Sequence, residues 1–224
     1  MRSLPLPLAL TARLSPVVVL AAMGWALTSG PFAATSTTEH KATPTTGSGA
    51  QADPTPSASA VTKTYGASPA PCGSVTTATV KSLVPGAKTD GKEIPSTDEK
   101  VRRTCSWNAL KGFDYRWLDV SFEISASDQV AQKSYTETIS KKTGGGAVPG
   151  LGDSAYSVVN LTTQDKQQTR EGVVVVRASN ALVVVTYNGS DFETKKAPST
   201  DEINKGAIKA AKEAVTALEG GKAA

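Results

Sequence analysis

The chain has 224 residues, of which 39% are hydrophobic and 20% are charged, and its formal net charge at neutral pH is +4. Residues 72–224 hold 20 basic and 18 acidic side chains in an interspersed pattern, so the net charge of this part is only +2. That balance lacks the basic stripe of nucleic-acid-binding proteins, and it predicts no nucleic-acid partner.

The N-terminal segment, residues 1–34, is predicted to carry the chain out of the cytoplasm. No charged residue lies between Arg13 and Glu39, and the strongly apolar part spans residues 14–27. This run lies between a secretory hydrophobic region of about 7–15 residues and a membrane-spanning helix of about 20. Basic residues precede it, so the N-terminus is expected to stay inside. We favour an uncleaved signal-anchor, with a single pass and an extracytoplasmic C-terminal domain; the alternative is a cleaved signal peptide and a secreted protein.

Residues 35–71 are rich in Thr, Ser, Ala, Pro and Gly and contain almost no large apolar groups. Such a segment cannot bury enough surface to offset the entropy of ordering, so it is predicted to be a disordered tether. His40, the only histidine of the chain, lies in it. The folded domain is therefore predicted to be residues 72–219, about 150 residues, followed by a short tail at 220–224.

Cys72 and Cys105 are the two cysteines of the chain. In an exported protein such a pair predicts a structural disulfide, which stabilises the fold by about 3–4 kcal/mol in the loop-closure treatment. A metal site would need more ligands, and the predicted domain contains no histidine, so we expect neither a metal nor a cofactor. A redox-active pair normally has Cys-x-x-Cys spacing.

The first half of the domain predicts a helix and a hairpin. Residues 74–86 are typical of a short helix that begins at Ser74, and residues 88–100 of a polar loop. Strands are predicted at 102–109 and 115–124, joined by a hairpin connection. In the second strand, four apolar side chains alternate with three polar ones, which predicts one buried and one solvated face: Leu118, Val120, Phe122 and Ile124 against Asp119, Ser121 and Glu123.

The second half predicts two helices and three further strands. Residues 127–142 form the first helix, and the "VPGLGDSAY" stretch turns the chain into a strand that begins near residue 154. A hairpin follows over 171–189, and the last helix, 199–221, begins with a capping box. The order α-β-β-α-β-β-β-α lacks βαβ alternation. It predicts a single α+β domain, an antiparallel sheet of about five strands with helices packed on it.

The inventory of catalytic side chains is poor, and we assign no catalytic residue. Without a histidine in the domain, Ser-His-Asp and Cys-His arrangements are not available. Asp119 and Glu123 could pair as in a glycosidase, but their alternation is typical of a solvated strand face. A Ser-Lys dyad stays open, since both residue types are numerous and nothing singles one out.

Two groups of residues form a possible binding surface. Tyr115 and Trp117 would make an exposed aromatic patch if they lie on the face opposite Leu118. The commoner arrangement for such rings is to pack beneath a helix, and we favour it. Gly150 and Gly152 are predicted to be turn residues rather than a phosphate cradle, and Asp153 to bond the amides of that turn.

Four motifs occur together in this order: Pro-Cys at 71–72, "CSW" at 105–107, "GLGDSA" at 150–155 and "VVVVRASNALVVVTY" at 173–187. The combination resembles a large actinobacterial family of exported lipoproteins and membrane-tethered proteins that carry a domain of unknown function. The resemblance covers residues 72–218. It implies a cell-surface, disulfide-bonded α+β domain without an established activity. This chain lacks the lipid-bearing cysteine of that pattern, which favours the hydrophobic anchor or free secretion.

Two functions are therefore expected from the sequence. The first is a non-catalytic binding or sensing domain that is attached to the membrane through the N-terminal segment and recognises an envelope ligand or protein. The second is a cell-envelope hydrolase or transferase with a catalyst other than histidine. A cleft of converging polar side chains with displaced pKa values would favour the second.

Overall fold

The structure, a computed structural model, describes residues 64–221. The predicted anchor, residues 1–34, and residues 35–63 of the predicted tether lie outside the described residues. Between residues 64 and 221, no helix has the length and apolarity needed to cross a bilayer. In chain order the elements are η1 (Pro71–Gly73), α3 (Thr77–Leu83), β1 (Lys92–Ile94), β2 (Arg102–Lys111), β3 (Asp114–Ile124), α4 (Asp128–Ser140), β4 (Gly146–Ala147), β5 (Ser154–Gln164), β6 (Gln167–Ala178), β7 (Ala181–Asp191) and α5 (Thr200–Gly220).

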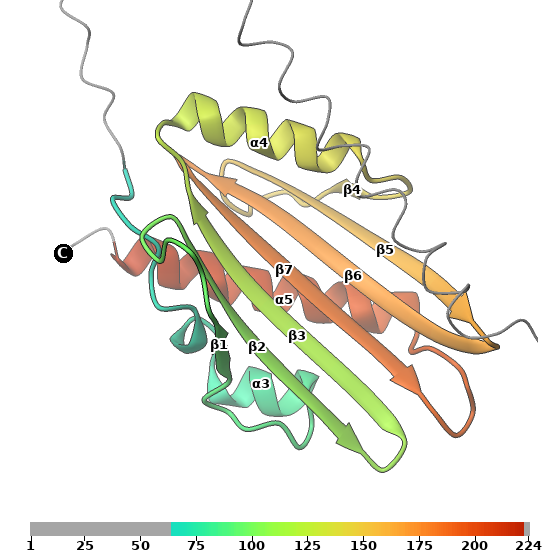
Figure 1. The fold of residues 1–224 in the computed structure, drawn as a ribbon. Coiled ribbons are helices and arrows are strands. Elements are labelled where there is room, and N and C mark those ends of the chain that lie inside the picture. Colours follow the sequence, from blue (N-terminus) through green and yellow to red (C-terminus); the bar gives the residue numbers. More distant parts are fainter. Residues whose placement is uncertain (1–63, 222–224) are drawn as a thin grey trace, which may run out of the picture. The chain divides into compact units, whose positions relative to one another are not determined.

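The strands form one antiparallel sheet in the order β1-β2-β3-β7-β6-β5-β4 (Figure 1). The predicted α+β class is confirmed, but the described part has seven strands, so the prediction of about five was too low. The additional strands are β1, with three residues, and β4, with two. Neither is long enough to show alternation, and both lie in segments that read as loops. Their conformation comes from pairing with β2 and β5.

Helix α5 covers one face of the sheet and packs on β5, β6 and β7 (Figure 1). Its predicted start is confirmed, since the Ser199 hydroxyl accepts a hydrogen bond from the Glu202 amide at 3.1 Å. Gly206 lets the helix approach the sheet, because a Cβ there would lie 2.6 Å from the ring of Tyr187. The face of α5 that packs on the sheet is buried: Ile203, Ala207, Ala210, Ala211, Ala214 and Leu218.

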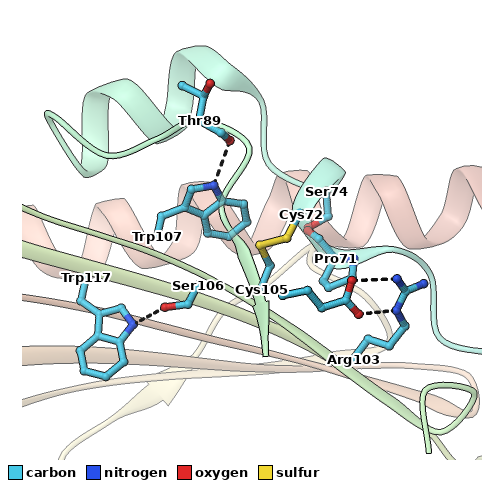
Figure 2. Close-up of a disulfide and its surroundings, with 10 residues drawn as sticks. Pro71, Cys72, Ser74, Thr89, Arg103, Cys105, Ser106, Trp107 and Trp117 are labelled. Carbon is cyan, nitrogen blue, oxygen red and sulfur yellow. Dashed lines mark hydrogen bonds and ion pairs between the residues drawn. A yellow bond between two sulfur atoms is a disulfide. The ribbon is translucent and has the colours of Figure 1, made fainter. Parts of the chain in front are cut away.

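The segment before β1 packs on the same face. Cys72 in η1 and Cys105 in β2 form the predicted disulfide, with Cα atoms 5.1 Å apart (Figure 2). Ser74 does not begin α3 as predicted; its hydroxyl donates to the Pro71 carbonyl oxygen at 2.6 Å and closes η1. Thr76 caps the helix instead, by accepting a hydrogen bond from the Thr79 amide. The disulfide thus binds a short helical segment to β2, the strand next to the edge strand β1.

The folded part begins earlier than the predicted boundary at residue 72. Tyr65 is buried, and its amide donates to the side-chain oxygen of Asn180 at 2.9 Å. The same Asn180 side chain donates to the carbonyl oxygens of Tyr65 and Ser125. A fully buried asparagine in the β6–β7 turn therefore holds residues at the start of the domain, a contact that composition does not reveal.

Helix α4 lies on the opposite face, across one end of the sheet (Figure 1). The Ser127 hydroxyl caps it by accepting a hydrogen bond from the Val130 amide, and its own residues Ala131 and Tyr135 are buried against the sheet. Tyr135 packs with one group of buried side chains on that face, Val158, Val173, Val175 and Leu182. These residues come from the halves of β5, β6 and β7 that lie nearer to α4. The other end of this face is without a helix among the described residues.

Candidate functional site

The end of this face beyond α4, here called the open face, carries side chains of five neighbouring strands. Leu118 and Val120 point into the α5 core and are fully buried. Because side chains alternate along a strand, Tyr115, Trp117 and Asp119 point to the open face. Trp117 is 37% exposed, so it does not pack beneath a helix, and the favoured alternative for this ring was wrong.

The indole of Trp117 is held in one orientation by two hydrogen bonds. Its ring N–H is 2.8 Å from the hydroxyl of Ser106 and 2.6 Å from a carboxylate oxygen of Asp119. Figure 2 shows the indole directed at Ser106 on the neighbouring strand. The donor of the ring is therefore already used within the protein. What Trp117 offers to a ligand is a fixed aromatic surface.

A row of polar side chains crosses the sheet at the level of Trp117. Cross-strand partners share a face of an antiparallel sheet, and the register continues from β2 to β5. Within residues 64–221, none of the four polar members makes a hydrogen bond or an ion pair through its side chain. We call this set the Trp117 row, in spatial order Asn108, Trp117, Asn188, Glu171 and Asn160.

An apolar group lies beside the row, at the β2–β3 hairpin. Tyr115 contacts Phe192 with ring centroids 6.1 Å apart, and burial raises the pKa of the Tyr115 hydroxyl. Leu110 is 57% exposed and Phe113 is 55% exposed. Leu110 pairs with Tyr115 in the register, so it also lies on the open face. The open face is thus bounded by apolar side chains on this side.

A cavity of about 590 Å³ bounds the open face on the β1 side of the sheet. Asp119, the carboxylate that holds the Trp117 indole, lines it together with Thr104 and Arg102 from β2. The loop between β1 and β2, including Ile94 and Pro95, forms its outer wall. Aromatic surface, free amides and a hollow therefore adjoin one another on the same face.

The "GLGDSA" residues lie at the other end of the strands. Gly150 and Gly152 have φ of 72° and 58°, so they are turn residues as predicted. Asp153 does not bond the amides of its own turn; its carboxylate accepts from the Ser179 amide at 2.7 Å and pairs with Arg177 at 3.1 Å. The reason is that the β6–β7 turn lies beside it, which only the fold decides.

A cavity of about 320 Å³ touches this turn, lined by Tyr135 and residues 147–155. Its acidic group, Asp153, is already occupied by Arg177 and Ser179. Trp117 pairs with Asn188, near the C-terminal end of β7. Asp153 instead bonds to Ser179, which lies before the first residue of β7. The predicted binding residues therefore form two separate sets, and the structure does not bring Gly150, Gly152 and Asp153 together with Tyr115 and Trp117.

The carboxylates with displaced pKa values serve local structure. Hydrogen bonds from the Arg103 guanidinium, at 2.6 and 2.8 Å, lower the pKa of Glu93 (Figure 2). The amide and hydroxyl of Thr194 lower the pKa of Asp191. In the described range, no group of three or more His, Cys, Asp or Glu side chains is placed to hold a metal ion.

Sequence reasoning identified Trp117 and missed the rest of its row. Alternation places Asn160, Glu171 and Asn188 on one face or the other of their own strands. It does not say that β7 lies next to β3, nor which residues face each other across strands. The sequence held one signal for them, which is that these three polar side chains interrupt strands that are otherwise mostly apolar or small.

The comparisons with known proteins identify no family. No protein-family model matches the chain, and no curated protein matches it. A crystal structure of a protein from Bacteroides thetaiotaomicron VPI-5482 aligns with 53% of this chain and 47% of that chain, at 6% identity and a TM-score of 0.33. The chain thus spans about half the length of that protein, and a likeness at this level carries no functional information.

Proposed function

We propose that this chain presents an extracytoplasmic, non-catalytic domain that binds a linear oligosaccharide on its open face. The observation that carries the proposal is Trp117, an exposed indole whose only donor is fixed by Ser106 and Asp119. One face of a sugar ring consists of C–H groups, which pack on an aromatic surface. A ring held in place beforehand loses little side-chain entropy when a ligand binds to it.

The neighbours of Trp117 supply the polar half of such a site. Asn108 and Asn188 flank the indole on adjacent strands, and their amides can both donate to and accept from sugar hydroxyl groups. Glu171 and Asn160 continue the row across β6 and β5. Five strands at a spacing of about 4.8 Å give a row about 19 Å long, which suits several linked sugar rings better than one.

Two features of the open face favour a sugar over a purely apolar ligand. The free side chains beside the indole are amides and a carboxylate, which an apolar ligand would leave without partners. The cavity next to Asp119 has Arg102 and Thr104 in its wall, so it can accept a polar substituent of the bound oligosaccharide. The apolar group at the β2–β3 hairpin lies beside the row and outside the proposed site.

The disulfide supports the proposed location outside the cytoplasm. Bonds such as Cys72–Cys105 persist in oxidising compartments and are rare where thiols are kept reduced. We also propose a membrane anchor within residues 1–34 and membership of the actinobacterial family that the four motifs resemble. Together they describe a domain at the cell surface, where carbohydrate polymers are abundant.

The test is binding of the full chain to a panel of defined linear and branched oligosaccharides, measured by calorimetry. Trp117→Ala should weaken binding about tenfold or more, since the stacking surface is lost. Asn188→Ala should weaken it by a smaller factor. Phe113→Ala removes a more exposed aromatic ring that lies outside the row, and the affinity of this variant should equal that of the unmodified chain.

Three results would overturn the proposal. The first is that no carbohydrate of the panel binds to the folded chain. The second is that Phe113→Ala weakens binding while Trp117→Ala does not, which would move the site to the hairpin. The third is cleavage or transfer of a bound oligosaccharide, which would favour an envelope hydrolase or transferase.

A further inference from the structure

The two edges of the sheet are protected very differently. At one edge, β1 has three residues, two of them charged, and Pro95 follows it. At the other edge, β4 pairs only with Tyr156 and Ser157 of β5. Residues 158–164 of β5 pair with β6 on one side and with no strand of the described chain on the other. Natural sheets usually shield such an edge with Lys, Pro or a bulge.

The free stretch carries none of these protections. Its sequence, Val-Val-Asn-Leu-Thr-Thr-Gln, contains no charged residue and no proline. Leu161, at its centre, is 48% exposed. A long, uncharged edge with an exposed apolar side chain is the arrangement that pairs with another strand.

The β5–β6 turn determines which backbone groups point outward. Asp165 and Lys166 both have positive φ, and Gln164 pairs with Gln167, as in a two-residue hairpin. Gln164 therefore exchanges its hydrogen bonds with β6, and outward-pointing residues alternate from there. The N–H and C=O groups of Leu161, and of Val159 and Thr163 on either side, face the open edge.

We propose that this edge pairs with the same edge of a second copy of the chain, in antiparallel register centred on Leu161. Leu161 is the central position of residues 158–164. A two-fold axis at Leu161 therefore places the outward-pointing N–H and C=O groups of one copy opposite those of the other. Leu161 faces Leu161, and Val159 faces Thr163, which gives about six backbone hydrogen bonds. The register uses the whole free stretch and ends where β4 and the turn at Asp165 begin.

A second copy fits this edge for two reasons. In pairing across a two-fold axis, any charged residue near the axis would lie close to the same residue of the second copy and repel it. Residues 158–164 contain no charged side chain, so this repulsion is absent. The two exposed Leu161 side chains then cover each other. One pair of short strands makes a small contact, so we expect a dimer in exchange with monomer rather than an obligate one.

This inference rests on the sheet edge and not on the proposed function. It has a consequence for the open face, because antiparallel pairing keeps corresponding faces of the two sheets on the same side. The Trp117 rows of two copies would then lie on one continuous sheet of twice the width. A long ligand could contact both copies.

The first experiment is cross-linking of the full chain through Leu161→Cys. Directly opposed residues of a hydrogen-bonded pair have Cα atoms about 5.5 Å apart, within the range of a disulfide. We expect a covalent dimer under mild oxidation, joined at residue 161 as identified by mass spectrometry. Leu110→Cys, at an exposed position on the β2–β3 hairpin, is the matched control and should stay largely monomeric.

The second experiment is sedimentation of Leu161→Pro. Proline removes an N–H that points away from β6, so the β5–β6 pairing is expected to remain and the fold to be kept. We expect at least a tenfold weaker dimer than that of the unmodified chain. A Leu161→Cys chain that cross-links no better than Leu110→Cys, or a dimer unaffected by Leu161→Pro, would overturn the proposal.

Discussion

Trp107 and Trp117 lie on neighbouring strands and differ in almost every other respect. Trp107 is 1% exposed, faces the α5 side of the sheet and donates its ring N–H to the Thr89 carbonyl oxygen at 3.0 Å (Figure 2). Trp117 is 37% exposed and faces the open side. In the register Trp107 pairs with Leu118, and Trp117 pairs with Asn108. The two rings therefore lie at adjacent positions of the register and point to opposite faces of the sheet. The same residue type therefore belongs to the core in one case and to a surface in the other.

The largest expected effect comes from removing each ring in turn. Trp107→Ala should lower the free energy of unfolding by about 3–5 kcal/mol, because a fully packed ring leaves a cavity beside Cys105. Trp117→Ala should lower it by less than about 1 kcal/mol, since the ring is partly solvated. Urea denaturation followed by circular dichroism measures both. Equal losses would contradict the assignment of the two faces.

The disulfide lies on the Trp107 side and should have the second largest effect. Replacing Cys72 and Cys105 together by Ser should lower the free energy of unfolding by about 3–4 kcal/mol. The bond joins η1 to β2 across 33 residues, so its loss frees the start of the domain. Denaturation with and without reductant provides an independent measurement. A stability that does not change on reduction would show that contacts such as Tyr65 with Asn180 hold this segment alone.

A tyrosine on each face gives a smaller, pH-dependent contrast. Burial raises the pKa of Tyr187 to about 12, and its hydroxyl donates to the Leu83 carbonyl oxygen at 2.8 Å. The unfolded tyrosine ionises near pH 10, so the folded state retains a proton that the unfolded state has lost. Stability from this group is complete below pH 10 and declines as the pH rises toward 12, by about 2 kcal/mol.

The control for this prediction uses the other face. Tyr187→Phe should flatten the fall in unfolding free energy between pH 10 and 12, measured by urea denaturation at fixed pH values. Tyr115→Phe, which changes the tyrosine beside Phe192, should change that slope less. A steeper contribution from Tyr115 than from Tyr187 would contradict the burial assigned to the two faces.

Local patterns predicted the elements that depend on a few adjacent residues. The start of α5 at Ser199 and its buried stripe follow from capping and from helical spacing, and the faces of β3 follow from alternation. The short strands β1 and β4 could not be predicted, because pairing with longer neighbours produces them. The partner of Asp153 was missed for a similar reason, since Ser179 comes near only when β6 and β5 pair.

The sequence by itself determined that this is an α+β domain with a disulfide and with one polar and one apolar side to β3, because these features depend on residue type and on short-range periodicity. Only the tertiary structure decided that α4 covers one end of the second face, that Trp117 stays exposed there, and that Asn108 and Asn188 flank it. Those facts depend on strand order and register. Both are determined by contacts between residues far apart in the chain, for which a single sequence holds no local signal.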